Sequence, residues 1–241
     1  MTRNAEGILT HKILLVEDDQ ELSEILATFL VGKGFEVETC SDGAKAIDVF
    51  KAVKPDLVLM DIQLPGRQVE LLGIELVAEI RALTMDVPII MVTARTETEV
   101  LEKAYEVGAD DYFKKSPWEP AELVARIKYH LKPQKQIEAQ DGLLRIGQIT
   151  LDVVGHEVRR GDEKVALTPL EFKLLSTLAG NPKKVFTRED LLQDVWDYPP
   201  QGDTRLVNVH IQRLRSKVEE DPDNPNIVVT VRGIGYKAGL N

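Results

Sequence analysis

The chain has 241 residues, which is long enough for two ordinary domains, and 43% of them are apolar, which excludes an intrinsically disordered chain. Its single cysteine, Cys40, excludes an internal disulfide and is typical of a reducing compartment. No apolar run has the length of a signal peptide or of a membrane span. We therefore expect a soluble, cytoplasmic protein with no membrane partner.

The net charge is −10, which taken alone argues against a nucleic-acid partner. The charge is unevenly divided, however: residues 1–132 carry 15 basic and 24 acidic residues, whereas residues 133–241 carry 15 and 16. Within residues 204–217 there are four basic residues and no acid. The second part of the chain therefore contains a local basic stripe that the average conceals.

Residues 12–131 alternate between apolar runs of strand length and helical patterns. Strands are predicted at 13–16, 37–40, 57–60, 88–93 and 112–114, and the helices that follow them at about 22–31, 44–53, up to 83, 97–107 and 120–131. Five such units predict an α/β fold, with a five-stranded parallel sheet and helices on both faces.

Acidic residues follow two of these strands. Glu17 and Asp18 come directly after 13–16, and Asp61 comes directly after 57–60. Ligands bind at the carboxyl ends of parallel strands, and carboxylates gathered there repel one another unless a cation neutralises them. Oxygen ligands with an open side suit Mg²⁺, so a magnesium site is predicted. Taken singly, Asp61 has the plainer interpretation of a helix cap or a turn residue.

Two further polar residues stand at strand ends. Thr93 ends the fourth predicted strand and Lys115 follows the fifth. They add a hydroxyl and an ammonium to the carboxylates and the metal. Together these groups predict a site for phosphoryl transfer.

Residues 12–131 resemble the receiver domain of response regulators, which has a flavodoxin-like fold. The matching stretches are 15–19 (LVEDD), 59–66 (LMDIQLPG), 91–95 (MVTAR) and 108–112 (GADDY). The resemblance implies that Asp61 accepts a phosphoryl group from a sensor histidine kinase. It implies that Mg²⁺ is bound directly by Asp18, Asp61 and the carbonyl of Gln63, and through water by Glu17. It also implies that Thr93 and Tyr112 turn toward the phosphorylated site.

Two departures from the family pattern lie beside this site. After Pro65 and Gly66 the family soon reaches an Asp-Gly pair, whereas residues 67–72 intervene here before Gly73. The family's lysine directly precedes a cis-proline, whereas this chain reads Lys115-Ser116-Pro117. Either Lys115 is the phosphate ligand or Ser116 takes its place. The spacing from Tyr112 favours Lys115, and a cis Ser116-Pro117 bond remains compatible with it.

Receivers of this subfamily pair through the fourth helix, the fifth strand and the fifth helix. Asp111 and Arg126 match the charged residues of that face, whereas Leu101 and Val107 stand where the family usually has a basic and an acidic residue. The resemblance therefore implies a homodimer on phosphorylation, with a more apolar contact. A solvated helix face is the alternative.

The second part begins after a polar, aperiodic segment. Residues 1–11 are assigned to an N-terminal extension, 12–131 to the receiver, 132–142 to a linker and 143–241 to a second domain. Strands at 143–146, 149–151, 157–160 and 164–166 predict a small antiparallel sheet. Thr168, Pro169 and Glu171 predict the start of a helix through a capping box, and another helix is predicted after Thr187.

The basic stripe falls on a third helix. Val207, Ile211, Leu214 and Val218 recur at i, i+4, i+7 and i+11 and predict its buried side. The far side would then carry Arg205, Val209, Gln212, Arg213 and Ser216, with His210, Arg215 and Lys217 on the flanks. Such a face suits the DNA major groove, where arginine reads guanine, glutamine reads adenine, valine contacts a thymine methyl and flanking cations grip phosphates. A solvated helix face is again the alternative.

A hairpin is predicted at 227–237, with Thr230 and Arg232 able to reach an adjacent minor groove. Residues 143–239 resemble the winged-helix domain of OmpR/PhoB-type regulators on the stretches 167–172 (LTPLEF), 209–215 (VHIQRLR) and 230–236 (TVRGIGY). The resemblance implies promoter DNA as a partner and the loop 197–202 as a contact for RNA polymerase. Asn208 stands where the family usually has aspartate.

These inferences predict a two-component response regulator that binds specific DNA under the control of phosphorylation at Asp61. Phosphate would favour pairing, so that two domains engage a repeated half-site. Two alternatives remain open: a DNA-binding protein whose receiver ignores phosphate, and a phosphotransferase or phosphatase of the aspartyl-phosphate type. The second would need another acid beside Asp61, where Ile62 and Gln63 stand, so no enzyme is expected.

Overall fold

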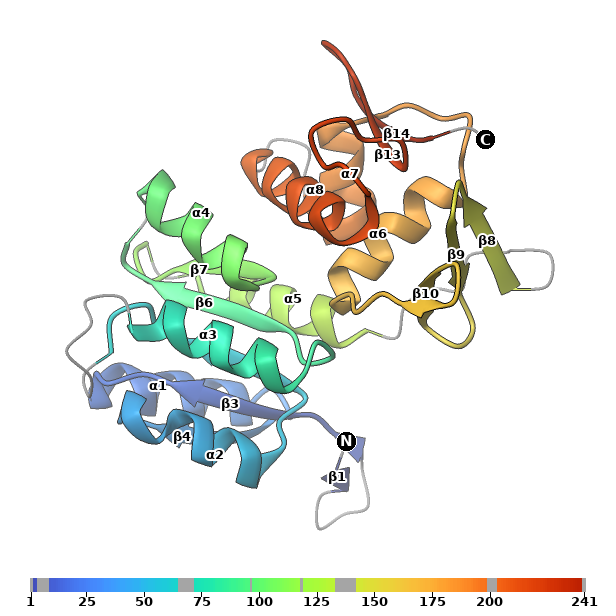
Figure 1. Cartoon of the computed structure of the whole chain (residues 1–241). Coiled ribbons are helices and arrows are strands. Elements are labelled where there is room, and N and C mark those ends of the chain that lie inside the picture. The colour runs from blue at the N-terminus through green and yellow to red at the C-terminus, as the bar shows by residue number, and fades with distance from the viewer. Residues whose placement is uncertain are drawn as a thin grey trace. The chain divides into compact units, whose positions relative to one another are not determined.

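The computed structural model describes residues 2–3, 9–64, 72–95, 97–117, 119–132, 142–198 and 203–239. The chain divides into two compact units, residues 1–132 and 133–241, and each is described by itself (Figure 1). Three predicted features lie largely outside the described residues: the linker, the apparent insertion after Gly66 and the loop expected to contact RNA polymerase.

The first unit is built on a five-stranded parallel sheet. Its strands are β3 (Lys12–Val16), β4 (Glu36–Cys40), β5 (Leu57–Met60), β6 (Ile89–Thr93) and β7 (Asp111–Lys114), in the spatial order β4-β3-β5-β6-β7. A short antiparallel pair, β1 (Thr2–Arg3) and β2 (Leu9–Thr10), precedes them and was not predicted. The predicted α/β sheet is confirmed.

Helices follow each strand of this sheet. They are α1 (Gln20–Val31), α2 (Ala46–Val53), α3 (Leu72–Leu83), α4 (Thr98–Val107) and α5 (Pro120–Leu131). A 3-10 helix, η1 (Gly43–Lys45), precedes α2, so the α-helix predicted from residue 44 begins two residues later. Among the described residues, no helix combines the length and the apolar character needed to cross a membrane.

The sheet is covered on both faces, which explains its continuous apolar strands. Every residue of β5 and β6 is buried. Side chains of α1 and α5 pack on one face in a single core cluster with Ile13, Leu59 and Phe113, while α2, α3 and α4 cover the other face (Figure 1). Because β3 and β5 are adjacent, the acids that follow them lie at the same edge of the sheet.

The described residues of the second unit form two antiparallel sheets and three helices. A four-stranded sheet contains β8 (Leu143–Ile146), β9 (Ile149–Asp152), β10 (Glu157–Arg160) and β11 (Glu163–Lys164). The helices are α6 (Pro169–Ala179), α7 (Arg188–Trp196) and α8 (Arg205–Val218). A three-stranded sheet, in the order β12-β14-β13, contains β12 (Phe186–Thr187), β13 (Val228–Val231) and β14 (Gly235–Ala238). The β13-β14 hairpin is the wing of the predicted winged helix.

Capping boxes begin the first two of these helices. At α6 the Thr168 hydroxyl accepts the Glu171 amide, and the Glu171 carboxylate accepts the Thr168 amide at 2.9 Å, as predicted. At α7 Thr187 and Asp190 repeat the arrangement. Both boxes satisfy amides that a helix N-terminus otherwise leaves unpaired, and so they fix where α6 and α7 start.

Candidate functional site

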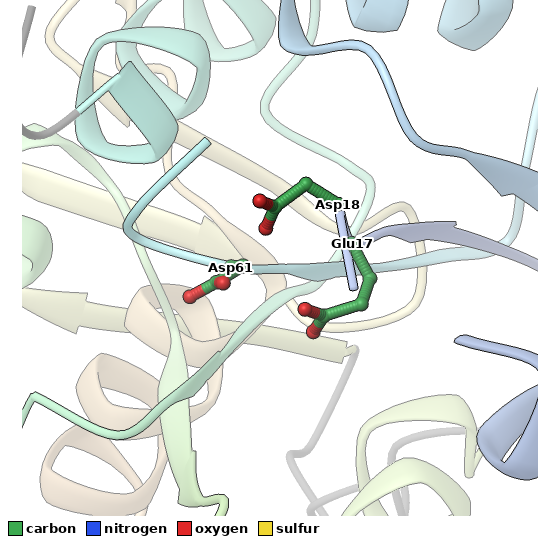
Figure 2. A group of neighbouring side chains, drawn as sticks. All are labelled: Glu17, Asp18 and Asp61. Atoms are coloured by element: carbon green, nitrogen blue, oxygen red, sulfur yellow. The ribbon is translucent and has the colours of Figure 1, made fainter. Parts of the chain in front are cut away.

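Three carboxylates meet at the carboxyl ends of β3 and β5. Glu17 and Asp18 follow β3 and Asp61 follows β5, and one oxygen of each lies within 4.8 Å of the others (Figure 2). Glu17 and Asp61 are buried, whereas Asp18 is exposed. The acidic cluster that the strand ends predict is therefore present, with one side chain facing solvent.

Lys115 joins two of these carboxylates. Its Nζ lies 2.7 Å from Asp61 Oδ2 and 2.8 Å from Glu17 Oε1. Ser116, the alternative residue, is exposed, and the bond between it and Pro117 is cis. The residue inserted before the proline therefore leaves the lysine in contact with the acids.

Burial dominates the acid-base properties of the cluster. It raises the pKa of Asp61, although the hydrogen bond from Lys115 acts in the opposite direction. It also raises the pKa of Glu17, with the neighbouring Asp61 charge adding to the effect. Burial alone would lower the pKa of Lys115, but its bonds to Asp61 and Glu17 outweigh this and raise it. One ammonium thus serves two buried carboxylates, which leaves excess negative charge.

The donor set fits a magnesium ion. The Oε2 atom of Glu17 is buried and has no hydrogen-bond partner among the described residues, and a buried carboxylate oxygen without a donor is costly. Hard oxygen ligands with one solvent-facing member match the preference of Mg²⁺, which keeps several waters. Gln63 lies beside the cluster, since its backbone amide donates to Asp61 Oδ1 at 3.3 Å.

The two predicted switch residues lie on neighbouring strands. Thr93 ends β6 and is fully buried, and its Oγ1 accepts the Arg95 amide at 2.9 Å. Tyr112 on β7 is half-buried, and its ring meets Tyr105 of α4 edge to face, with centroids 6.3 Å apart. The helical pattern of α4 marks Tyr105 only as a core position, so the sequence analysis missed this partner.

Asp111 differs from the expected surface charge. Its carboxylate is fully buried and binds Arg126 at 2.8 Å and His130 at 3.3 Å, both of α5. The difference arises because α5 packs over the end of β7 and covers the aspartate. Within the chain, the charge of Asp111 is therefore paired with residues of α5, and its part in a contact with a second receiver stays a prediction.

The exposed face of α8 is narrower and less basic than predicted. Arg205, Gln212 and Ser216 are exposed and Val209 is half-buried, as expected. Arg205 is nevertheless paired with Asp203 at 2.6 Å. Neutral side chains therefore make up most of this face.

Four residues of α8 that are predicted to contact DNA have packing or ion-pair partners within the second unit. His210 is fully buried, with its ring 5.4 Å from that of Trp196. Arg213 and Lys217 reach Glu171 of α6, at 3.1 and 2.6 Å. Arg215 is also buried: burial lowers its pKa, and it donates to the Val228 carbonyl at 2.7 Å. The four-residue stripe underestimated the buried side of α8, because α6, α7 and the wing enclose the helix from several directions.

The wing presents its predicted residues to solvent. Thr230 and Arg232 are both exposed, and the Thr230 hydroxyl accepts a hydrogen bond from Arg215 at 2.7 Å. Glu219, which the sequence analysis did not single out, accepts the amides of Asn226, Ile227 and Val228 at 2.7–3.0 Å. This buried carboxylate fixes the connection between α8 and the wing.

Comparison with protein families identifies both units. The family described as response regulator receiver domain matches residues 13–128, and the family described as transcriptional regulatory protein, C terminal, matches residues 162–238. The chain is similar to the DNA-binding response regulator MtrA of Mycolicibacterium smegmatis, with 48% identity over 96% of this chain and 98% of that protein. It is 40% identical to a probable transcriptional regulator, ycf27, of Porphyridium aerugineum, over 93% of this chain and 94% of that protein.

A solved structure gives the same assignment. A mutant of RitR has a TM-score of 0.71 and 30% sequence identity, over 96% of this chain and 100% of that chain. Both units, the parallel sheet with its acidic edge and the winged helix, are thus accounted for by one family. The chain belongs to the OmpR/PhoB-type response regulators and is a DNA-binding response regulator.

Proposed function

We propose that Asp61 is the phosphoacceptor of this response regulator and that a sensor histidine kinase is its phosphodonor. The observation that carries the proposal is the convergence of Asp61, Glu17 and Asp18 on one space, with Lys115 bonded to Asp61. Asp61 stands at the end of β5, where a phosphoryl group can approach from the edge of the sheet.

The chemistry follows from the charges around Asp61. An oxygen of its carboxylate forms a bond to phosphorus while the bond between phosphorus and the donor's imidazole nitrogen breaks, and the imidazole departs. Lys115 holds an ammonium 2.7 Å from this carboxylate and can hold a phosphoryl oxygen after transfer. Mg²⁺ bound by Asp18, Asp61 and the Gln63 carbonyl, with Glu17 acting through water, would neutralise charge on the phosphoryl oxygens. Deprotonated Asp61 is required, because only the carboxylate is nucleophilic.

Phosphate at Asp61 is proposed to act through Thr93 and Tyr112. Thr93 ends β6, which is adjacent to β5, and Tyr112 lies on β7, the next strand of the sheet. The Thr93 hydroxyl now accepts the Arg95 amide and can instead donate to a phosphate oxygen. The proposed outcome is a homodimer of receivers through α4, β7 and α5. Arg126 remains a candidate for that face, since its side chain is 16% exposed, whereas Asp111 is fully enclosed.

The DNA contacts proposed for the second domain are those that reach solvent. Val209, Gln212 and Ser216 of α8 are placed in a major groove, with Arg205 at the start of the helix, and Thr230 and Arg232 of the wing at an adjacent minor groove. Pairing of two receivers would let two such domains engage a repeated half-site.

The remaining assignments rest on the resemblance to the family and on where promoter DNA is found in the cell. We propose residues 12–131 as receiver, 132–142 as linker and 143–241 as effector domain. RNA polymerase is proposed as a partner of the loop at 197–202, and the cytoplasm as the compartment in which promoter DNA is reached. The protein is proposed to act as a regulator and not as an enzyme, since Ile62 and Gln63 supply no second acid after Asp61.

A phosphodonor assay tests the assignment of Asp61. Wild-type protein, Mg²⁺ and acetyl phosphate should give a mass increase of one phosphoryl group that hydroxylamine removes, and Asp61→Asn should give none. Asp48→Asn, at an exposed position of α2, is the matched control and should behave as wild type. Stoichiometric uptake by Asp61→Asn contradicts the proposal. Phosphorylation that changes neither oligomeric state nor DNA affinity would favour a receiver that does not respond to phosphate.

A further inference from the structure

One arginine near α8 differs from the cations of the helix itself. Arg188 is the first residue of α7 and is half-buried. Its Nε donates to Asn208 Oδ1 of α8 at 2.8 Å, and its guanidinium lies 5.2 Å from the ring centroid of Tyr236 on β14. The same Asn208 oxygen accepts the Tyr236 hydroxyl at 3.0 Å. Three elements thus hold this side chain in one place.

The charge of Arg188 is not neutralised by these contacts. Arg213 and Lys217 share the carboxylate of Glu171, and Arg205 pairs with Asp203. In the described part of the second unit, Arg188 has no carboxylate at ion-pair distance, and its hydrogen-bond acceptor is a neutral amide. Of the two acids in the first turn of α7, Asp190 accepts the Thr187 amide and Glu189 is exposed to solvent.

The position of Arg188 relates it to the DNA-facing elements. Asn208 directly precedes Val209, which is proposed to face the major groove, and Tyr236 belongs to the wing proposed to reach the minor groove. The sugar-phosphate backbone separates the two grooves of a duplex, so a cation between α8 and the wing is placed opposite that backbone. An arginine whose Nε is already bonded keeps its two terminal nitrogens for a phosphate.

We propose that Arg188 is a phosphate-binding residue of the DNA interface, held by Asn208 and Tyr236. The proposal rests on the proposed placement of α8 and the wing on DNA. It gives Asn208 a role, because an aspartate at that position would pair with Arg188 and cancel the charge offered to DNA. Because the residue at position 208 is a neutral asparagine, the positive charge of Arg188 remains available beside α8, which itself offers little positive charge.

The test measures binding of the full-length protein to a fluorescein-labelled duplex of random sequence over a series of salt concentrations. Each phosphate contact contributes about 0.9 to the slope of log affinity against log salt. Arg188→Gln should lower the magnitude of the slope by about 0.9, and Arg188→Lys should retain most of it. Lys183→Gln, an exposed cation between α6 and β12, controls for the change in net charge and should alter the slope much less.

A second variant changes the charge beside Arg188 and keeps the number of heavy atoms the same. Asn208→Asp preserves the acceptor oxygen for Arg188 and Tyr236, and it should lower both the affinity and the slope. Asn181→Asp, at an exposed position, is its control. Thermal unfolding of each variant identifies any that fails to fold.

The outcomes distinguish failure of the role proposed for Arg188 from failure of the DNA surface proposed for α8 and the wing. If Arg188→Gln and Lys183→Gln give equal slopes, or if folded Asn208→Asp binds as well as Asn181→Asp, the role of Arg188 is overturned while the DNA surface stands. If the wild-type protein shows no salt-dependent affinity for duplex DNA, the proposed DNA surface fails and this inference fails with it.

Discussion

The Nζ atom of Lys217 lies 2.6 Å from Oε2 of Glu171, and the other oxygen of that carboxylate lies 3.1 Å from Arg213. Glu171 is fully buried and also caps α6 through the Thr168 amide. One carboxylate is therefore paired with two cations of α8 that residue spacing predicts to contact DNA. Breaking such a buried pair leaves an uncompensated charge, which keeps both cations in place.

Lys217→Gln should accordingly weaken binding to random duplex DNA no more than Lys183→Gln does. Glu171→Gln should have the opposite effect, because glutamine keeps the capping box but releases the two cations. The salt slope of this variant should become steeper by about 0.9 for each new phosphate contact. Fluorescence anisotropy across a salt series measures both. A Lys217→Gln slope that falls by a full contact relative to Lys183→Gln would show that Lys217 grips phosphate after all.

The arrangement of α8 shows where sequence reasoning is sound and where it fails. Helical spacing correctly places Val207, Ile211, Leu214 and Val218 in the core, because apolar side chains are buried wherever the helix meets another element. It does not reveal how many elements surround the helix. The buried cations of α8 could be located only once Glu171 of α6 and the Val228 carbonyl were known to face them.

Substitutions of His210 and Gln212 should have different effects, the first on stability and the second on DNA binding. His210 is fully buried against Trp196, so His210→Ala should lower the free energy of unfolding by on the order of 2 kcal/mol through the cavity it leaves. Gln212 is exposed, so Gln212→Ala should change stability by less than about 0.5 kcal/mol while relaxing base preference at one position. Urea unfolding and a footprint over genomic DNA measure the two effects. Unchanged stability of His210→Ala would contradict its place in the core.

The rate of phosphorylation can show whether Lys115 or Ser116 is the phosphate ligand. Lys115→Ala removes the ammonium that lies 2.7 Å from Asp61 Oδ2, and phosphorylation by acetyl phosphate should slow by about 10²-fold, the scale seen when one charge-stabilising group is removed. Ser116→Ala alters an exposed side chain and should leave the rate near that of the wild type. Time courses of intact mass with Mg²⁺ present give both rates. A slow Ser116→Ala and a fast Lys115→Ala would exchange their roles.

The receiver site was more predictable than the DNA surface. Parallel strands bring their carboxyl ends to one edge, so Glu17, Asp18, Asp61 and Thr93 could be grouped from strand boundaries alone. The cover of α5 over Asp111 could not, because burial of an aspartate depends on a helix that is distant in the chain. Topology fixes which strand ends meet, whereas the burial of a charge depends on side-chain packing that residue spacing does not encode.

Asp61 should destabilise the receiver at neutral pH when no cation is bound. Burial raises its folded-state pKa above 3.8, so the native state binds a proton more readily than the unfolded chain does. The stability that this proton provides is complete at low pH and is lost as the pH rises through the folded-state pKa. Asp61→Asn lacks the ionisable group and also relieves Glu17, whose pKa the Asp61 charge raises further.

In EDTA at neutral pH, Asp61→Asn should therefore have a larger free energy of unfolding than the wild type, because the variant buries no ionised carboxylate at this position. The difference should shrink as the pH falls, because the native carboxyl of Asp61 then takes up a proton and loses its charge. Urea unfolding at several pH values measures it, and Asp48→Asn, at an exposed site, should show no such gap. Added Mg²⁺ should stabilise the wild type more than the variant, because the variant lacks one anionic ligand. The opposite result would be a difference in unfolding free energy that widens as the pH falls. It would mean that ionised Asp61 stabilises the native state, and the cluster would then not need a cation.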